Sequence, residues 1–284
     1  MLLQYCKFCG SERIAPRFQL SRYKLQVLAC EECRFLFVDY VNTNYLTPTV
    51  NEWDYESHAA NLEKKFSAYC DHMEKYFSFA GKYILDVGAG GGDFLYQTKQ
   101  RGAQPLGLDL DLTGIDFSQN RYGITILPHL VEETTLEKES FDAVTMWEVV
   151  EHVNDPQKTV AAIASLLKRG GYLFLSTPCL DSLWDRVGIF LYKITFGAIQ
   201  FPLLYRFSWA HLQIFSRHHL EELLRRNGFT VIYFEQRTEF TYPSEMYLEK
   251  IKPKLLRKFL ASIWDIFNRV LPIGNKMLVY ARKE

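Results

Sequence analysis

The sequence predicts an α/β fold built on a doubly wound parallel sheet, and three observations support this prediction. Short apolar segments such as Tyr83–Val87 and Phe141–Trp147 alternate with segments of helical periodicity. Such alternation is typical of a parallel sheet that carries helices on both faces. A glycine-rich turn, Gly88–Gly92, joins the first of these strands to a helix. The length of 284 residues leaves room for one large domain with a small appendage.

The glycine-rich turn has the layout of a cofactor site. Glycines let the backbone approach a ligand closely, and the start of the following helix offers unpaired N–H groups to an anion. A dinucleotide fingerprint G-x-G-x-x-G counted from Gly88 would need glycine or alanine at position 93, where the chain has Asp93. The spacing that fits is D-x-G-x-G-x-G, from Asp86 through Gly88 and Gly90 to Gly92.

This motif resembles the first motif of the class I S-adenosylmethionine (SAM) dependent methyltransferases. The resemblance implies a seven-stranded Rossmann-like sheet and SAM as the cofactor. Asp86 suits SAM, because an acid attracts the cationic end of SAM and would repel a pyrophosphate. Asp109 lies 21 positions after Gly88, close to the spacing expected of a carboxylate that binds ribose hydroxyls. The predicted cofactor-binding residues are Asp86, Gly88, Ala89, Gly90, Gly92, Asp109, Leu110, Leu130, Val131 and Trp147.

The segment Trp147–Val153, W-E-V-V-E-H-V, follows the predicted fourth strand and is the candidate catalytic segment. In small-molecule methyltransferases this region faces the methyl group and its acceptor. His152 is the candidate base, because the unperturbed pKa of histidine lies near neutrality. The alternative is that His152 only hydrogen-bonds its own turn. Glu151 and His211 complete the predicted catalytic set, although His211 could equally cap a loop.

The E-V-V-E-H residues also resemble the corresponding segment of the ubiquinone-biosynthesis O-methyltransferases. In those enzymes two acids and a histidine bind a divalent metal, which implies Glu148, Glu151 and His152 as ligands of Mg²⁺. The same E-H-V pattern occurs in methyltransferases that need no metal, so both interpretations stand at this point.

Four cysteines near the start predict a zinc-ribbon-like module over residues 1–45, ahead of a methyltransferase domain over 46–284. Cys6-x2-Cys9 and Cys30-x2-Cys33 are separated by 20 residues, a spacing used by four-cysteine zinc sites. Four sulfur ligands leave no open position, so this Zn²⁺ would be structural. The alternative is that the ligands are vestigial. Because Lys7 interrupts the start of the chain, we expect no signal peptide and a reducing, cytoplasmic location.

Two apolar segments stand out in the second half of the chain. Residues 183–207 form an insert rich in aromatic and aliphatic side chains, which is either a lid or lipid-contacting surface or a helical pair that simply packs. Residues 250–271 predict an amphipathic helix with basic residues near its start. Such a helix can lie on a membrane surface, pack on its own domain, or form a homodimer with a second copy.

Charge and overall resemblance indicate the acceptor class. Basic and acidic residues balance at 33 each, which disfavours nucleic acid, so we expect no DNA partner. Over nearly its whole length, apart from Trp184–Tyr205, the chain resembles bacterial methyltransferases of surface-polysaccharide and secondary-metabolite pathways. That resemblance implies a small-molecule acceptor, such as a sugar or phenolic hydroxyl. The alternatives are an RNA methyltransferase that uses the zinc module to hold RNA, and a non-catalytic scaffold on the same fold.

Overall fold

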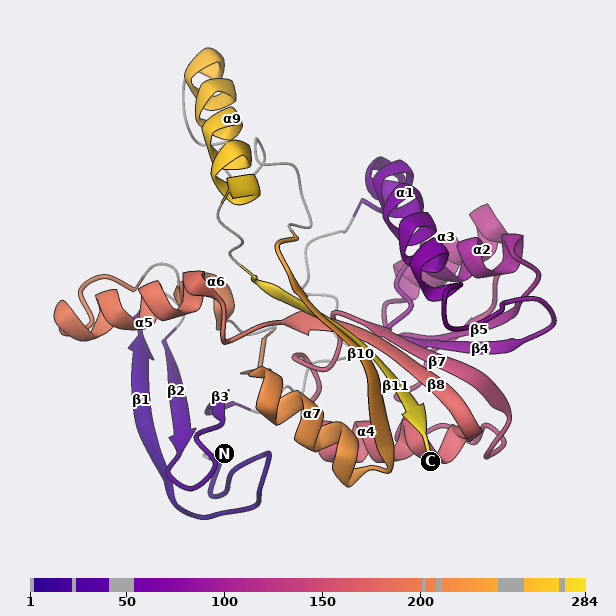
Figure 1. Ribbon diagram of the computed structural model, residues 1–284, viewed down its shortest axis with the longest axis horizontal. Coiled ribbons are helices and arrows are strands. Elements are labelled where there is room, and N and C mark those ends of the chain that lie inside the picture. The colour runs from indigo at the N-terminus through magenta and orange to yellow at the C-terminus, as the bar shows by residue number, and fades with distance from the viewer. Residues whose placement is uncertain are drawn as a thin grey trace.

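A seven-stranded sheet forms the centre of the molecule in the computed structural model (Figure 1), which describes residues 3–21, 24–40, 54–200, 203–207, 211–239, 253–270 and 274–284. The strand order is β10-β11-β8-β7-β4-β5-β6. The strands are β4 (Tyr83–Val87), β5 (Gln104–Leu108), β6 (Ile126–Leu127), β7 (Phe141–Trp147), β8 (Leu167–Pro178), β10 (Phe229–Arg237) and β11 (Lys276–Lys283). The predicted α/β class and seven-stranded sheet are therefore confirmed.

The sheet is mixed: its alternating βα part is parallel, as predicted, and its last strand runs the other way. Strands β8, β7, β4, β5 and β6 run parallel, but β11 pairs antiparallel with both β8 and β10. The chain enters β11 from the same edge of the sheet at which β8 and β10 end. That edge therefore carries the carboxyl ends of the parallel strands together with the first residue of β11, Lys276.

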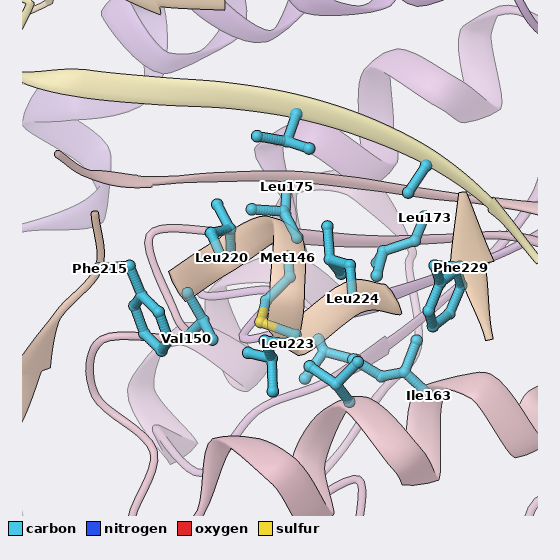
Figure 2. Packing of buried hydrophobic residues seen from close by; sticks show 14 of the residues in the cluster. Met146, Val150, Ile163, Leu173, Leu175, Phe215, Leu220, Leu223, Leu224 and Phe229 are labelled. Atoms are coloured by element: carbon cyan, nitrogen blue, oxygen red, sulfur yellow. The ribbon is translucent and has the colours of Figure 1, made fainter. Parts of the chain in front are cut away.

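Helices cover both faces of the sheet (Figure 1). On one face, aromatic residues of the first three helices pack against Ile84, Phe174 and Tyr280. On the other face, leucines of α7 and isoleucine and valine of α4 pack against β7, β8 and β11, as Figure 2 shows for Met146 and Leu175. The helices are α1 (Tyr55–Met73), α2 (Asp93–Gln100), α3 (Leu112–Tyr122), α4 (Pro156–Leu166) and α7 (Arg217–Arg226). Because both faces of the central strands are buried, β4 and β7 are mostly apolar on both sides, whereas the edge strand β10 is partly exposed.

A second, four-stranded sheet contains the cysteine module and one strand from far along the chain. Its order is β1-β2-β3-β9, with β1 (Ile14–Leu20), β2 (Leu25–Cys30), β3 (Leu36–Val38) and β9 (Gln213–Ile214). The β3–β9 pairing joins the module to the segment that carries His211. Phe35, next to the second cysteine pair, packs on Phe215 within the core of the larger sheet. The 45/46 domain boundary stays a prediction, but the two units share a sheet and a core.

The two apolar segments of the second half are helical. The insert contains α5 (Leu183–Ile194) and α6 (Leu203–Arg206), and the predicted amphipathic helix is α9 (Lys254–Val270). Within the described ranges, no helix combines the length and the apolar character needed to cross a membrane. In Figure 1, α9 projects away from the sheet, and α5 lies beside the end of β1.

Candidate active site

The glycine loop between β4 and α2 has a backbone that only glycine accommodates at two positions. Gly88 and Gly92 have φ angles of +73° and +78°, in the left-handed region. A Cβ at Gly92 would lie 2.2 Å from Ser118 Oγ, and one at Gly88 would lie 2.4 Å from Val149 Cγ2. The loop therefore packs tightly on α3 and on the Trp147–Val153 segment. This close packing holds the loop's backbone at the start of α2, as a SAM-type motif requires.

Asp109 secures the loop from the end of β5. One oxygen of its carboxylate accepts a hydrogen bond from Gly90 N at 2.6 Å. The other accepts from Leu110 N at 2.7 Å and from Asp111 N at 2.9 Å. The predicted cofactor residues Gly90, Asp109 and Leu110 are thus brought together at one sheet edge, while the hydrogen bonds from Asp109 to ribose stay a prediction.

Asp86 is a buried residue of β4, and its side chain contacts the neighbouring strand β7. Its side chain is 2% exposed, and Thr145 Oγ1 donates a 2.6 Å hydrogen bond to its carboxyl. Burial raises the pKa of Asp86 to about 8. A contact between this acid and the cationic end of SAM stays a prediction.

Tyr55, at the start of α1, lies over the glycine loop and was missed by the sequence prediction. Its hydroxyl donates a 2.6 Å hydrogen bond to Asp111, and its ring stacks on Phe117 with centroids 5.4 Å apart. A Cβ built at Gly91 would lie 2.5 Å from Tyr55 Cδ1. The sequence predicted an amphipathic helix here, but no motif marked this tyrosine as part of the site.

The remaining predicted cofactor residues lie on neighbouring strand ends. Leu130 and Val131 follow β6, the former half-buried and the latter buried. Trp147, the last residue of β7, is 7% exposed and packs edge-on against Tyr69 of α1, with centroids 4.9 Å apart. Its indole Nε1 is buried without a hydrogen-bond partner among the described residues. A buried, unpaired donor at this edge is consistent with a site built for a ligand.

Three predicted catalytic residues, Glu151, His152 and His211, come together after β7. One carboxylate oxygen of Glu151 and one imidazole nitrogen of each histidine all lie within 4.8 Å of one another. The centroids of the two imidazole rings are 4.8 Å apart. Glu151 Oε2 accepts a 2.9 Å hydrogen bond from Thr177, and its Oε1 lies 3.9 Å from His152 Nε2. Burial and the nearby Glu148 raise the pKa of Glu151 well above its usual value. Burial therefore favours the protonated form of this carboxyl.

His211 is held in one tautomer. Its Nδ1 lies 2.9 Å from the carbonyl oxygen of Arg206. Because a carbonyl only accepts, Nδ1 must donate, which leaves the lone pair of the neutral ring on Nε2. Burial and the neighbouring His152 lower the pKa of His211 to about 4, so this ring is neutral at physiological pH.

Glu148 lies outside this three-residue group, so the described side chains do not bring the predicted Mg²⁺ set of Glu148, Glu151 and His152 together. Ser176 donates a 2.7 Å hydrogen bond to one oxygen of Glu148, and Lys276 Nζ lies 3.1 Å from the other. Burial alone would raise the pKa of Glu148, but the Lys276 and Lys65 ammonium groups and the hydrogen bond from Ser176 together hold the pKa below its usual value. The remaining set is one carboxylate and two imidazoles, whereas Mg²⁺ prefers oxygen ligands. The residues present do not fit Mg²⁺.

A buried ionic network continues from Lys276 and was not predicted. Lys276 Nζ lies 3.3 Å from Glu239, and Lys65 of α1 lies 3.1 Å from the same carboxylate. Tyr69 donates to Glu239 at 2.8 Å. Burial by itself would raise the pKa of Glu239, but these cations, with Arg237, hold it at about 2. Its members come from α1, β10 and β11, so no local sequence pattern could have shown their proximity.

The four cysteines lie together at the end of the small sheet, as predicted. Cys6 and Cys33 sulfurs are 3.6 Å apart, and so are those of Cys9 and Cys30. A tetrahedral zinc with Zn–S bonds of about 2.3 Å places its sulfurs about 3.8 Å apart, so the four side chains fit Zn²⁺. Phe8 N and Cys33 N point at cysteine sulfurs, as in zinc knuckles.

A glycine loop at the carboxyl edge of a doubly wound sheet, facing a buried acid–imidazole cluster, defines an enzyme with a nucleotide-type cofactor. Comparison with known proteins identifies the class further. Residues 60–233 match the family model described as a methyltransferase domain. The chain is 37% identical over 131 residues to a ubiquinone biosynthesis O-methyltransferase of Chromobacterium violaceum, covering 44% of this chain and 56% of that protein. It is 35% identical over 111 residues to the Coxiella burnetii protein of the same name, covering 37% and 47%.

Solved structures agree on the fold. A magnesium protoporphyrin IX methyltransferase from Synechocystis, solved with bound SAH, has a TM-score of 0.54 at 15% identity, covering 82% of this chain and 90% of that one. A SAM-dependent methyltransferase from Archaeoglobus fulgidus has a TM-score of 0.53 at 18% identity, covering 81% and 100%. The chain spans about half the length of the curated relatives it matches. It belongs to the class I SAM-dependent methyltransferase family.

Proposed function

We propose that the protein transfers the methyl group of SAM to a hydroxyl of a small-molecule acceptor, a sugar or a phenol. One observation carries this proposal: the glycine loop and the candidate catalytic turn are in direct contact. Val149, in the middle of E-V-V-E-H, packs against Gly88 so closely that no Cβ fits there. A group held on the loop would therefore lie beside Glu151 and His152.

His152 acts as the general base in this proposal. Bound SAM supplies a methyl group already activated by its sulfonium, so the chain's own residues mainly orient the acceptor and take its proton. His152 is 35% exposed in its side chain, so an acceptor can reach it, and its Nε2 lies 3.9 Å from Glu151 Oε1. His211, neutral and of fixed tautomer, lines the acceptor side with its ring 4.8 Å from that of His152.

A hydroxyl acceptor is supported by the two relatives named above, which are called O-methyltransferases. The cofactor residues proposed are those of the loop and strand ends, with Asp86, Gly90 and Asp109 central. The Zn²⁺ is structural, because the cysteine cluster lies in the small sheet, away from the glycine loop. Side chains of the described part of the chain orient the acceptor in this proposal.

Calorimetry with S-adenosylhomocysteine tests the cofactor half of this proposal. We expect saturable binding, weakened most by Asp109→Ala among the strand-end acids. Absence of binding at millimolar ligand would refute the proposal, and an unchanged affinity in the variant would remove Asp109 from the site.

Transfer of a labelled methyl group from SAM to a panel of sugars and phenols tests the acceptor half. His152→Asn should lower turnover by roughly a hundredfold or more while leaving S-adenosylhomocysteine affinity unchanged. Normal cofactor binding with no turnover on any acceptor would instead favour the non-catalytic scaffold. Turnover on RNA alone, with salt-sensitive binding, would favour the RNA alternative.

A further inference from the structure

Helix α5 has two faces, and one of them is anchored. Tyr192 OH lies 2.9 Å from Gln19 N of β1, which donates to it, and the Tyr192 ring packs edge-on against Phe18 with centroids 5.0 Å apart. Ile189 packs on the same cluster. The orientation of the helix is therefore set by its contacts with the small sheet.

The opposite face of α5 exposes large apolar side chains. Leu183, Val187, Phe190 and Ile194 are 46%, 40%, 60% and 54% exposed. Their spacing of four, three and four residues places them in one stripe along the helix. Phe196, just beyond the helix end, is 98% exposed. We call Leu183, Val187, Phe190, Ile194 and Phe196 the α5 apolar face.

The charges around this face are positive. Arg186 and Lys193 are exposed and lie beside the stripe on the same helix. The one acid of the helix, Asp185, is buried and pairs with Arg206 at 2.8 Å, so it contributes nothing to the outer surface. Long basic side chains beside an apolar stripe can keep their charged ends in water while their stems lie along an apolar layer.

We propose that the α5 apolar face docks on an anionic lipid bilayer, with α5 lying in the plane of the interface. A helix with an apolar stripe flanked by cations matches the negative headgroups and the acyl boundary at once. A second copy of this chain fits less well, because a two-fold interface through the same face would bring Arg186 and Lys193 of both copies together.

Helix α5, which carries the α5 apolar face, is connected by direct contacts to the acceptor side of the site. Arg206 pairs with Asp185 of α5 through its guanidinium and holds His211 through its carbonyl oxygen at 2.9 Å. Strand β8, which contributes Thr177 to Glu151, leads directly into α5. The lipid surface would therefore meet the protein on the acceptor side. Lipid binding itself does not depend on the proposed methyl transfer.

Co-sedimentation of the full chain with vesicles tests the proposal. We expect binding to vesicles of phosphatidylcholine with phosphatidylglycerol, and much weaker binding to phosphatidylcholine alone. Phe190→Glu with Phe196→Glu should lower the partition coefficient at least about tenfold. Arg186→Gln with Lys193→Gln should lower it about fivefold for each cation and reduce its salt dependence.

The control is Ile232→Glu, which charges an exposed isoleucine on β10, outside α5, and should leave vesicle binding unchanged. S-adenosylhomocysteine affinity, equal in all variants, shows that each is folded. Failure of the wild-type protein to bind anionic vesicles would overturn the proposal. So would a dimer in solution that Phe190→Glu with Phe196→Glu converts to a monomer, because the face would then belong to a second copy.

Discussion

The cofactor half and the acceptor half of the site are built in opposite ways. Most of the cofactor half lies in one continuous stretch from Asp86 to Leu110, and its defining contact, Gly90 to Asp109, spans 19 residues. Leu130, Val131 and Trp147 complete it from neighbouring strand ends. The acceptor half joins the Glu148–His152 turn to His211, Glu239 and Lys276, which lie far along the chain. The first half depends on local backbone geometry and the second on tertiary packing, so damage to each should have separable effects.

Removal of the proposed Zn²⁺ should have the largest effect, and it should affect the acceptor half far more than the cofactor half. The binding energy of a structural Zn²⁺ is also folding energy, about 10 kcal/mol or more in small zinc modules. Without it β3 loses its fixed position beside β9, whose neighbour Leu212 donates a 2.8 Å hydrogen bond to Glu151 O. We expect turnover to be lost and S-adenosylhomocysteine binding to persist, as measured on chelated protein and on Cys9→Ser.

Added Zn²⁺ should restore turnover to the chelated protein but not to the cysteine variant. Purified protein with no zinc by atomic absorption would contradict the assignment of the metal. Loss of cofactor binding in parallel with turnover would show that the halves are not independent.

Lys276→Met should lower the free energy of unfolding by about 3 kcal/mol, because it leaves the partly buried Glu148 without its cation, while Glu239 keeps Lys65 and Arg237. Lys283→Met on the same strand is the matched control. Lys283 pairs with Glu139, whose side chain is 59% exposed, so its loss should cost about 1 kcal/mol or less. Urea denaturation of the two variants measures the difference. Equal stability losses would show that the Glu148–Lys276–Glu239 network contributes no more than a surface pair.

Gly92→Ala should lower the free energy of unfolding by about 3 kcal/mol. This cost is the sum of the strain of alanine at a left-handed φ and the crowding of its Cβ, 2.2 Å from Ser118 Oγ. Gly81→Ala isolates the strain, because Gly81 has a φ of +72° with nothing within 4 Å of an added Cβ. Calorimetry should show a clear loss of S-adenosylhomocysteine affinity for Gly92→Ala alone. An equal affinity in the two variants would mean that the crowding at Ser118 is relieved without moving the loop.

The same contrast explains which parts the sequence could predict. The glycine loop, Asp109 and the four cysteines follow short spacing rules, because backbone conformation and metal geometry restrict which residues can stand there. The sequence left open whether His211 joins the catalytic set or caps a loop. Its proximity to His152 depends on the pairing of β9 with β3 of the four-cysteine module, which no local pattern predicts. Lys276, Glu239 and Tyr55 carried no signal at all. Each is ordinary in its own segment and becomes part of the site only when the antiparallel β11 and helix α1 pack on the sheet edge.

Asp86→Asn gives the smallest expected effect and tests the cofactor half through pH. With a folded pKa of about 8 and an unfolded value near 4, Asp86 binds more protons when folded across that range. The wild-type protein should therefore lose stability as pH rises toward 8. Unfolding releases the proton of Asp86 in this range, and a higher pH favours that release. Asparagine keeps the acceptor oxygen for Thr145 and removes the titration.

The stability of Asp86→Asn relative to wild type should therefore grow by about 2 kcal/mol between pH 6 and pH 8, because 1 pKa unit corresponds to about 1.4 kcal/mol. Thermal unfolding at the two pH values measures it, with Asp116→Asn on α3 as a matched control outside the network. A constant difference between variant and wild type would show that Asp86 titrates below this range. If Asp86 attracts the cationic end of SAM, the same variant should bind SAM more weakly than wild type at pH 8, and equal affinity would assign this acid to the fold alone.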